Sequence, residues 1–293
     1  MSADRSTAPH QPVMLDRIVE YLRPAAGRTL VDATFGAGGH SRALLAAGAD
    51  VIGIDQDDEA LGHARAIDSD RFRFVKGNFR NLHEHLASLG VGAVHGILCD
   101  LGVSSMQLDQ GERGFAFRQA GPLDMRMGSQ PESADQVVNT YPQEELAALI
   151  FRYGEERHSR RIARAIVAAR EVQPIETTDR LSQVIASAYP PGQRREHPAR
   201  RTFQALRIFV NDELGALSDL LEQAPGLLVE GGRLAILSYH SLEDRLVKHA
   251  FRGQARLEPL TRRPLVASDD EVARNPRARS AKLRVAEKKT VAA

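Results

Sequence analysis

Two acidic residues follow neighbouring apolar runs, with a glycine-rich turn and a helix-length segment between them. Asp32 lies in the run 29–33, which leads into Gly36 and Gly38, and Asp55 ends the run 51–55. This order predicts a βαβ unit that holds a nucleoside at the carboxyl ends of its strands. There Asp55 can accept hydrogen bonds from both ribose hydroxyls, and the two glycines let the backbone approach a ligand closely.

The glycine pattern differs from that of a dinucleotide site. A pyrophosphate site has G-x-G-x-x-G, whereas the third glycine position here is Ser41. Asp32, four residues before Gly36, would repel a diphosphate but would attract a cationic amino group. S-adenosylmethionine (SAM) has an amino-acid end, a sulfonium and a ribose, so both acids would have partners. We therefore expect SAM as cofactor, with an ordinary βαβ turn as the alternative.

Composition and cysteine usage limit the class of protein. The 293 residues are 42% hydrophobic and 26% charged, which is typical of globular proteins. Cys99 is the single cysteine, so no intramolecular disulfide can form and a reducing compartment is expected. No apolar signal-peptide segment opens the chain, and no run approaches the roughly 18 apolar residues of a membrane span. We expect a cytoplasmic protein that does not bind a membrane, and we expect no metal.

Charge is distributed in alternating blocks along the chain. Residues 1–151 carry 13 Lys/Arg and 20 Asp/Glu, and residues 208–244 carry 1 and 7. Residues 152–207 carry 12 Lys/Arg and 6 Asp/Glu, and residues 245–293 carry 13 and 5. Solvated helix faces would explain one basic block. Two such blocks in a nucleoside-binding enzyme favour a nucleic-acid substrate, because Lys and Arg make most phosphate contacts.

The hydrophobic periodicity predicts an interrupted α/β fold. Strands are expected at 29–33, 51–55, 72–75 and 93–99, alternating with helices at 39–47, 57–67 and 80–89. Residues 102–131 then form a loop, 134–188 are helical, 194–201 are a basic loop and 202–224 form one long helix. The chain then continues with a turn at Gly231-Gly232, a strand at 233–237 and a helix at 242–251. It ends with a mobile segment at 253–280 and an antiparallel strand at 282–287.

The fold class is therefore α/β: a Rossmann-like SAM-dependent methyltransferase sheet with an inserted all-helical domain between strands 4 and 5. We place the first part of the methyltransferase domain at 1–108, the substrate-recognition insertion at 109–210 and the second part at 211–293.

Asp100 follows the fourth strand, at the edge of the sheet where ligands bind. The lone pair of an aryl amine is delocalised into its ring, so a carboxylate that accepts its N–H bonds makes the nitrogen a better nucleophile. Methyl transfer is then an in-line displacement that depends on close placement of the reacting atoms. Asp100 is a candidate catalytic residue, with a turn cap as the alternative.

Other polar or aromatic residues follow the remaining strands. His240 comes after the fifth strand and is a second catalytic candidate, as a substrate contact or proton acceptor. Ser241 and Asp244 beside it also fit the start of a helix. Asn78-Phe79 comes after the third strand and is expected to reach the adenine, with Phe79 stacking on it or packing in the core. Ser104 and Ser105 fit a turn cap better than a base contact.

A row of arginines is expected to bind RNA phosphates. Arg157, Arg161 and Arg164 recur at i, i+4 and i+7, opposite an apolar face formed by Ile162, Ile166 and Ala169. The basic loop adds Arg194, Arg195 and Arg201. The alternative for these residues is a solvated face.

The motifs together resemble the RsmH (MraW) family, the bacterial small-subunit rRNA cytosine-N4 methyltransferases. The matching segments run in order over nearly the whole chain; they are Asp32–His40, Asp100–Ser105 with Gln107-Leu-Asp109, Glu112–Phe115, Gly121–Met127, Tyr153–Arg157, Arg161–Ile166, His197-Pro198, Arg201–Ala205, Ser238–Arg245 and Asn275–Ser280.

The resemblance implies methylation of a cytidine N4 in the decoding (P-site) region of 16S rRNA, with the small ribosomal subunit as partner and RNA held by the helical insertion. It implies SAM contacts from Gly38, Gly39, His40, Asp55, Phe79, Asp100 and Gln107. A cytosine in folded rRNA would have to be splayed out to react.

One departure from a wider pattern matters. Many amino-methyltransferases carry (Asp/Asn/Ser)-Pro-Pro-aromatic after strand 4, whereas this chain has Asp100-Leu-Gly-Val. The aromatic that stacks on the target base is therefore left open between Phe115, Phe117 and Tyr239. The oligomeric state, with a homodimer as one option, and a lid role for residues 102–132 are open as well.

Rival functions remain at this stage. One is a SAM enzyme acting on another nucleic acid or on a small molecule, and the basic blocks disfavour the small molecule. Another is a non-catalytic nucleoside-binding module that docks on ribosomes. A nicotinamide dehydrogenase is disfavoured by Asp32 and by the missing third glycine.

Overall fold

A computed structural model describes residues 12–103, 110–117, 119–190 and 197–290. The chain forms two compact units, which we describe one at a time. The first comprises Met1–Gly102 and Leu214–Ala293, and the second comprises Val103–Glu213. Among the described residues, no helix combines the length and the apolar character that crossing a membrane requires.

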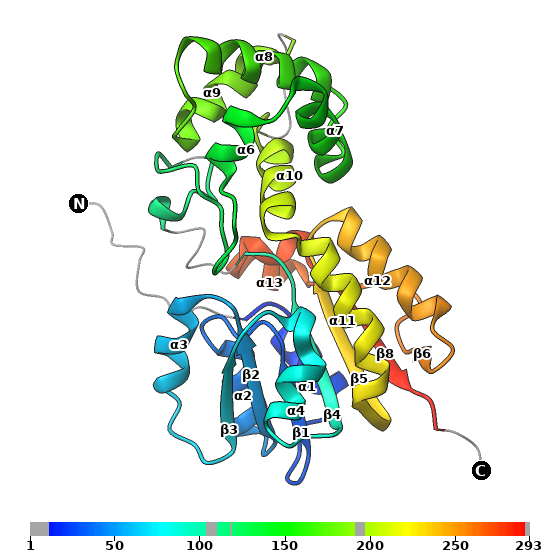
Figure 1. Cartoon of the computed structure of the whole chain (residues 1–293). Helices are drawn as coiled ribbons and strands as arrows, with labels where there is room; N and C mark the ends of the chain where they lie inside the picture. Colours follow the sequence, from blue (N-terminus) through cyan, green and yellow to red (C-terminus); the bar gives the residue numbers. More distant parts are fainter. Residues whose placement is uncertain (1–11, 104–109, 118, 191–196, 291–293) are drawn as a thin grey trace. The chain divides into compact units, whose positions relative to one another are not determined.

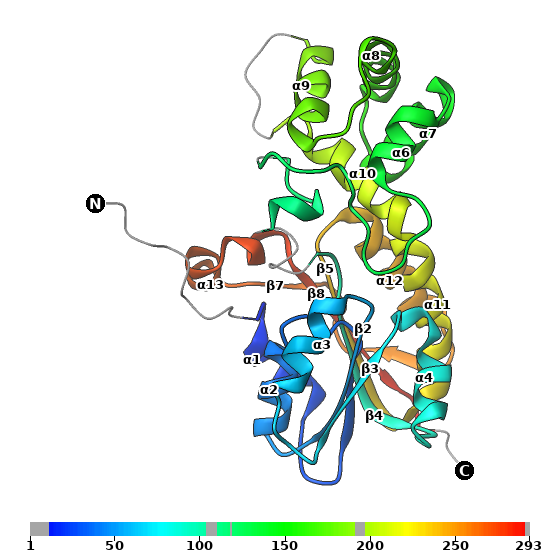
Figure 2. The same ribbon diagram turned by 60° about the vertical axis from the view of Figure 1, so that its left-hand side comes forward.

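The first unit is built on a mixed sheet with strand order β3-β2-β1-β4-β5-β8-β6 (Figure 1). Strand β7 also pairs with β8 (Figure 2). The strands are β1 (Thr29–Asp32), β2 (Asp50–Asp55), β3 (Phe72–Lys76), β4 (Val94–Asp100), β5 (Leu228–Ser238), β6 (Leu257–Pro259), β7 (Leu265–Val266) and β8 (Lys282–Lys288). Strands β1 to β5 are parallel, and β8 runs antiparallel to β5. This is the strand order of SAM-dependent methyltransferases, and the helical insertion lies between β4 and β5 as expected.

Helices cover both faces of this sheet because successive strand residues point to opposite sides. Leu30 and Leu98 pack with α1 (Leu15–Leu22) and α2 (Gly39–Ala46). Their neighbours Val31 and Ile97 pack on the opposite face with α4 (Leu82–Ser88), α11 (Glu213–Leu227) and α12 (Ser241–Gly253), as Figures 1 and 2 show. Strand β4 is buried on both faces, which its nearly continuous apolar sequence predicts.

The helices of the βαβ repeats lie close to their predicted positions. Helix α3 spans Asp58–Arg65, and the helix predicted at 80–89 is the short 3-10 turn η1 (Phe79–Asn81) followed by α4. Helix α1 was not predicted. Its buried residues are only Ile18 and Leu22, so the apolar stripe in the sequence is short.

Two predictions for the last third of the chain are wrong in detail. The segment 253–280 is structured, with β6, β7, α13 (Asp269–Arg274) and the 3-10 turn η3 (Pro276–Ser280). It is held by buried Leu257 and Ala278 and by β8, where Val285 donates its N–H to Oγ1 of Thr261 at 3.0 Å. Gly231-Gly232 lies inside β5, at an irregularity where Val94 pairs with Leu228 but Gly96 pairs with Arg233.

The second unit is helical, with α6 (Ala134–Thr140), α7 (Gln143–Gly154), α8 (Ser159–Val172), α9 (Thr178–Ala188) and α10 (Arg200–Asn211). These helices share one apolar core that includes Leu146, Ile162, Ile185 and Leu206, each fully buried. The single long helix predicted over 202–224 is wrong. Asp212 has φ +46° and ends α10, and α11 begins at the next residue.

The segment before these helices packs against them. Leu123 and Met125 are buried in the helical core, and the N–H of Met127 donates to Oδ1 of Asn211 at 2.6 Å. Pro122 forms an isolated bridge with Thr177. Residues 110–133 contain no strand among those described, as predicted, but they are integrated into the core through regularly spaced apolar side chains.

Candidate active site

The glycine turn between β1 and α2 is shaped around one aromatic ring. Gly38 has φ +76°, and a Cβ there would lie 2.7 Å from the ring of Phe35. A Cβ on Gly53 of β2 would meet the same ring at 2.7 Å. Phe35 is 3% exposed and therefore packs where only glycines leave room. Gly38 was predicted from close ligand approach, and the structure adds a packing reason for it and for Gly53.

Asp32 lies at the end of β1 and is fully buried. Its Oδ2 accepts a hydrogen bond from Oγ of Ser41 at 2.7 Å, so the residue that replaces the third glycine of a dinucleotide motif serves this carboxylate. Burial raises the pKa of Asp32, although His40 and Ser41 offset part of that effect. A buried acid of this kind favours a cationic neighbour.

Asp55, at the end of β2, connects the second strand to the glycine turn. Its Oδ2 accepts from the N–H of Gly36 at 2.7 Å, and its Oδ1 accepts from the N–H of Asp57 at 2.8 Å. Each oxygen keeps a further lone pair for a ligand hydroxyl. Burial raises the pKa of Asp55 to about 6, and the charges of Asp57 and Asp32 add to the increase.

Asp100 ends β4 and makes contacts with three elements of the first unit. Its N–H donates to Oγ1 of Thr34 at 2.7 Å. Its Oδ1 accepts from the hydroxyl of Tyr239 at 2.7 Å, and its Oδ2 lies 3.8 Å from Nδ1 of His40. His40 is held by a 3.1 Å hydrogen bond between its Nε2 and the carbonyl of Val13. Burial raises the pKa of Asp100 to about 6, while His40 and Tyr239 lower it.

Tyr239 is the site residue whose role the sequence did not predict. It was considered only as a base-stacking aromatic, whereas its hydroxyl is bonded to Asp100. Its N–H donates to Oε2 of Glu243 at 2.7 Å, which fixes the start of α12. Burial, with Asp100 next, raises the pKa of Tyr239 well above its usual value, so the hydroxyl keeps its proton and donates. The available signal was that Tyr239 directly follows β5, the strand beside β4.

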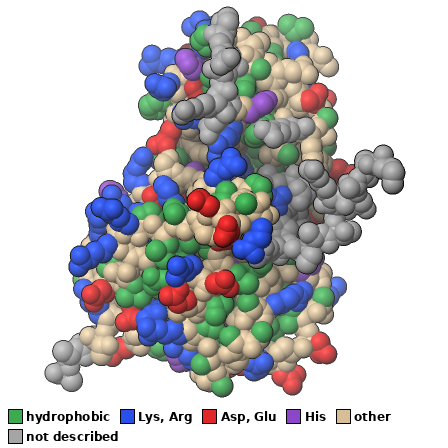
Figure 3. Space-filling model, turned by 180° about the vertical axis from the view of Figure 1, so that it is seen from behind, with side chains coloured by type: hydrophobic (Ala, Val, Ile, Leu, Met, Phe, Trp, Pro, Cys, Tyr) green, Lys and Arg blue, Asp and Glu red, His purple; other side chains and the backbone are tan. Residues whose placement is uncertain are grey.

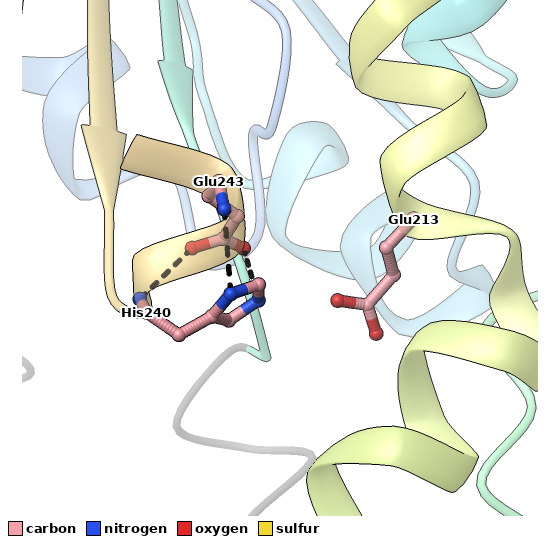
Figure 4. Close-up of side chains that lie close together, drawn as sticks. All are labelled: Glu213, His240 and Glu243. Atoms are coloured by element: carbon pink, nitrogen blue, oxygen red, sulfur yellow. Dashed lines mark hydrogen bonds and ion pairs between the residues drawn. The ribbon is translucent and has the colours of Figure 1, made fainter. Parts of the chain in front are cut away.

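His240 is the N-cap residue of α12 (Figure 4). Its Nδ1 accepts from the N–H of Glu243 at 3.4 Å, and the Glu243 carboxylate accepts from the N–H of His240 at 3.2 Å. Its Nε2 lies 3.1 Å from Oε1 of Glu243 but is not aligned for a hydrogen bond. The capping box therefore begins one residue earlier than Ser241, where the sequence placed it, because the imidazole acts as the cap acceptor.

Two of the residues expected at the adenine have other contacts. Asn78 caps η1, with Oδ1 accepting from the N–H of Arg80 at 2.9 Å, and its Nδ2 donates to Oε1 of Gln56 at 2.8 Å. Phe79 is half-buried and packs against the core beneath α4. Gln107, Ser104 and Ser105 lie outside the described residues.

The expected RNA-binding arginines belong to the helical unit. Arg157, Arg161 and Arg164 are exposed, and none makes a side-chain bond to a described residue. Arg157 precedes α8, which begins at Ser159, so the predicted single helical face of three arginines is wrong for that residue. Arg201 on α10 donates from Nη1 to the carbonyl of Glu155 at 2.8 Å. Arg194 and Arg195 lie outside the described residues.

The other two aromatic candidates pack within the helical unit. Phe115 is 6% exposed and belongs to its core. Phe117 stacks on His197 with ring centroids 4.7 Å apart. Of the three candidates for stacking on the target base, Tyr239 is the one bonded to Asp100.

The sheet and the acids at its carboxyl edge define an α/β nucleoside-binding enzyme of the SAM-dependent methyltransferase type. The model of the MraW methylase family matches residues 7–289. The chain is 57% identical over 286 residues to "Ribosomal RNA small subunit methyltransferase H" of Deinococcus radiodurans, covering 98% of this chain and 92% of the relative. The protein of the same name from Carboxydothermus hydrogenoformans is 48% identical over 303 residues, with 95% and 97% covered.

The chain therefore belongs to the MraW methylase family, and it is a methyltransferase. This confirms the resemblance found in the sequence, and it overturns the rival view of a non-catalytic module. The solved structure of an rRNA methylase from Streptococcus thermophilus is 13% identical over 97% of this chain and all of that chain, with a TM-score of 0.43. That likeness is too weak to add to the assignment.

Proposed function

We propose that this methyltransferase transfers a methyl group from SAM to the exocyclic N4 of a cytidine in the decoding region of 16S rRNA. The observation that carries the proposal is the carboxylate of Asp100 at the carboxyl end of β4, oriented by the Tyr239 hydroxyl at 2.7 Å. Family membership supports the class of reaction, and the relatives named above are rRNA methyltransferases of the small subunit.

The residues around the glycine turn fit SAM. Burial raises the pKa of Asp32, Asp55 and Asp100, and the charge of Asp32 adds to the increase at the other two, so a sulfonium and an ammonium group would stabilise their ionised forms. Asp55 has lone pairs left for the ribose hydroxyls. The N–H groups of Gly39 and His40 in the first turn of α2 have no described acceptor and suit the ligand carboxylate.

Asp100 then acts on the amine. Bound SAM supplies an electrophilic methyl group. The ionised Asp100 carboxylate accepts an N–H of the cytosine amine, which shifts electron density to nitrogen and orients its lone pair for in-line attack. After transfer the nitrogen carries an excess proton, which the Asp100 carboxylate would accept. Tyr239 holds the carboxylate in one orientation, and His240 acts through the capping of α12.

Replacement of Asp100 tests this role. Asp100→Ala should bind SAM within a few-fold of the wild-type affinity by calorimetry but lose about 10²-fold or more in turnover on small ribosomal subunits. Asp100→Asn keeps an acceptor oxygen and should retain more activity than the alanine variant. Asp70→Ala, an exposed acid of the same unit, is the matched control. Normal turnover by Asp100→Ala would remove this carboxylate from the mechanism.

Substrate choice is tested separately. A methyl-transfer assay on small subunits, free 16S rRNA and DNA distinguishes the proposed substrate from other nucleic acids. A nucleoside map of 16S rRNA by mass spectrometry, from cells with and without the protein, should lose methylation at one cytidine. An unchanged map would contradict the proposal.

A further inference from the structure

The first unit has a cavity of about 370 Å³ that none of the active-site residues lines. Its walls are the C-terminal half of α12, strand β6 with the residues that follow it, and the middle of β8. This volume is within the range of ligand sites in proteins. The segment 253–280, which was predicted to be mobile, supplies one wall.

The lining of this cavity is strongly basic. Lys248, Arg252, Arg262 and Arg284 face a single carboxylate, that of Glu258. Among the described residues, Lys248, Arg252 and Arg262 form no ion pair or hydrogen bond through their side chains. Arg252 and Arg262 are exposed, and Figure 3 shows Lys and Arg side chains along the left-hand margin of its lower part. Arg284 is paired with Asp244, so Lys248, Arg252 and Arg262 against Glu258 leave the cavity with a net positive charge.

Arg284 is the deep member of this group. Its side chain is only 8% exposed, and its Nε donates to Oδ1 of Asp244 at 2.7 Å. Its two terminal nitrogens have no hydrogen-bond acceptor among the described residues. These nitrogens are not among the fully buried unpaired atoms, so they open on the cavity and are available to an oxygen-rich ligand there.

We infer that this cavity binds a phosphate group of the RNA backbone and so gives the substrate a second anchor, on the methyltransferase unit. The inference rests on the proposed function. Arg284 would make the buried, bidentate contact, and Lys248, Arg252 and Arg262 would neutralise the phosphate at the rim. Phe251 and Pro259 add apolar surface to the lining, which the attached sugar would contact.

Position favours an RNA strand over a free anion. His240, beside Tyr239 at the end of β5, precedes α12, and Lys248 lies eight residues along the same helix. At about 1.5 Å per residue this is about 12 Å, a span that a few nucleotides cover. Exposed Arg256 and Arg263 adjoin the cavity in sequence, so the positive charge continues beyond it.

The test compares Arg252→Gln/Arg262→Gln with the control Arg23→Gln/Arg65→Gln, which removes two exposed arginines at the ends of α1 and α3 in the same unit. RNA binding is measured over a range of salt concentrations. The cavity variant should bind rRNA several-fold more weakly, and the plot of log K against log salt should become less steep, by up to about 0.7–0.9 for the one phosphate that the cavity holds. The control should match the wild type.

The outcomes separate this inference from the proposed function. The inference would be wrong if the cavity variant and the control had the same slope of log K against log salt, with SAM affinity and thermal midpoint unchanged. This holds even if the wild type methylates rRNA. A reduced slope would support it even if the methylated nucleoside proves to be a different one. Heat released by AMP binding to the wild type but not to the cavity variant, with equal RNA slopes, would assign the cavity to a free nucleotide and overturn the RNA anchor.

Discussion

The carboxylate of Asp100 links local geometry to reaction chemistry. Burial raises its pKa to about 6, and the hydrogen bond from Tyr239 opposes that increase. The ionised carboxylate is the form that accepts the amine N–H, so Asp100 is active above about pH 6. The same burial that excludes water therefore places the titration of Asp100 close to neutrality.

This arrangement predicts a pH profile. The kcat/KM for SAM, which reports the enzyme before SAM binds, should fall as the pH decreases through about 6, because Asp100 and Asp55 take up protons there. Tyr239→Phe removes the hydroxyl that stabilises the carboxylate, so the pKa of Asp100 should increase and the acid limb should move to higher pH. Activity of this variant should recover at alkaline pH. An acid limb at the wild-type position would show that Tyr239 does not tune Asp100.

The contacts of Phe35 show which features of the site the sequence could not predict. The need for glycine at position 38 was predicted from ligand approach, but the ring of Phe35 against Gly38 and Gly53 joins two segments that are distant in sequence. No local pattern reports such a contact. The hydroxyl contact between Tyr239 and Asp100, 139 residues apart, was missed for the same reason.

At the scale of elements, the strands and helices of the sheet were predicted well because their periodicity is strong. The errors are the missed helix α1, the short elements within 253–280 and the break at Asp212. The break at Asp212 depends on Asn211, whose side chain donates to the carbonyl of Met125 at 2.7 Å and accepts from the N–H of Met127. Both partners are 84 or more residues away, so the helical pattern over 202–224 gave no sign of it.

Helix α8 supports a prediction about RNA. Arg157, Arg161 and Arg164 are exposed and have no described partners, so replacing all three with Ala should leave the fold intact. The plot of log K against log salt for rRNA should become less steep, by about 0.7–0.9 for each phosphate that these arginines neutralise in the wild type. The Arg23→Gln/Arg65→Gln variant is again the control. An unchanged slope would return these arginines to a solvated helix face.

At the scale of the whole molecule, separate apolar cores support the two units. One core lies within 103–213, and others flank the sheet on its two faces. Leu206→Ala removes a fully buried side chain from the helical core and should destabilise that unit by about 2–5 kcal/mol. Denaturant unfolding measures the decrease, and Val172→Ala, at an 85% exposed position of the same unit, is the control.

Below the transition of the Leu206→Ala variant, its SAM affinity should match that of the wild type, because the acids and glycines proposed to bind SAM belong to the first unit. A decrease of SAM affinity in proportion to the decrease of stability would mean that the two cores do not act independently.

The sequence alone determined the class of sheet, the place of its helical insertion and the acids at the strand ends, because hydrophobic periodicity and strand-end positions are local properties. Tertiary structure alone decided that Tyr239 donates to Asp100, that His240 caps α12 and that Arg284 is buried beside a basic cavity. The Tyr239 and Arg284 contacts depend on side chains brought together from distant segments, and the cap depends on the imidazole of His240 turning back onto the N–H of Glu243.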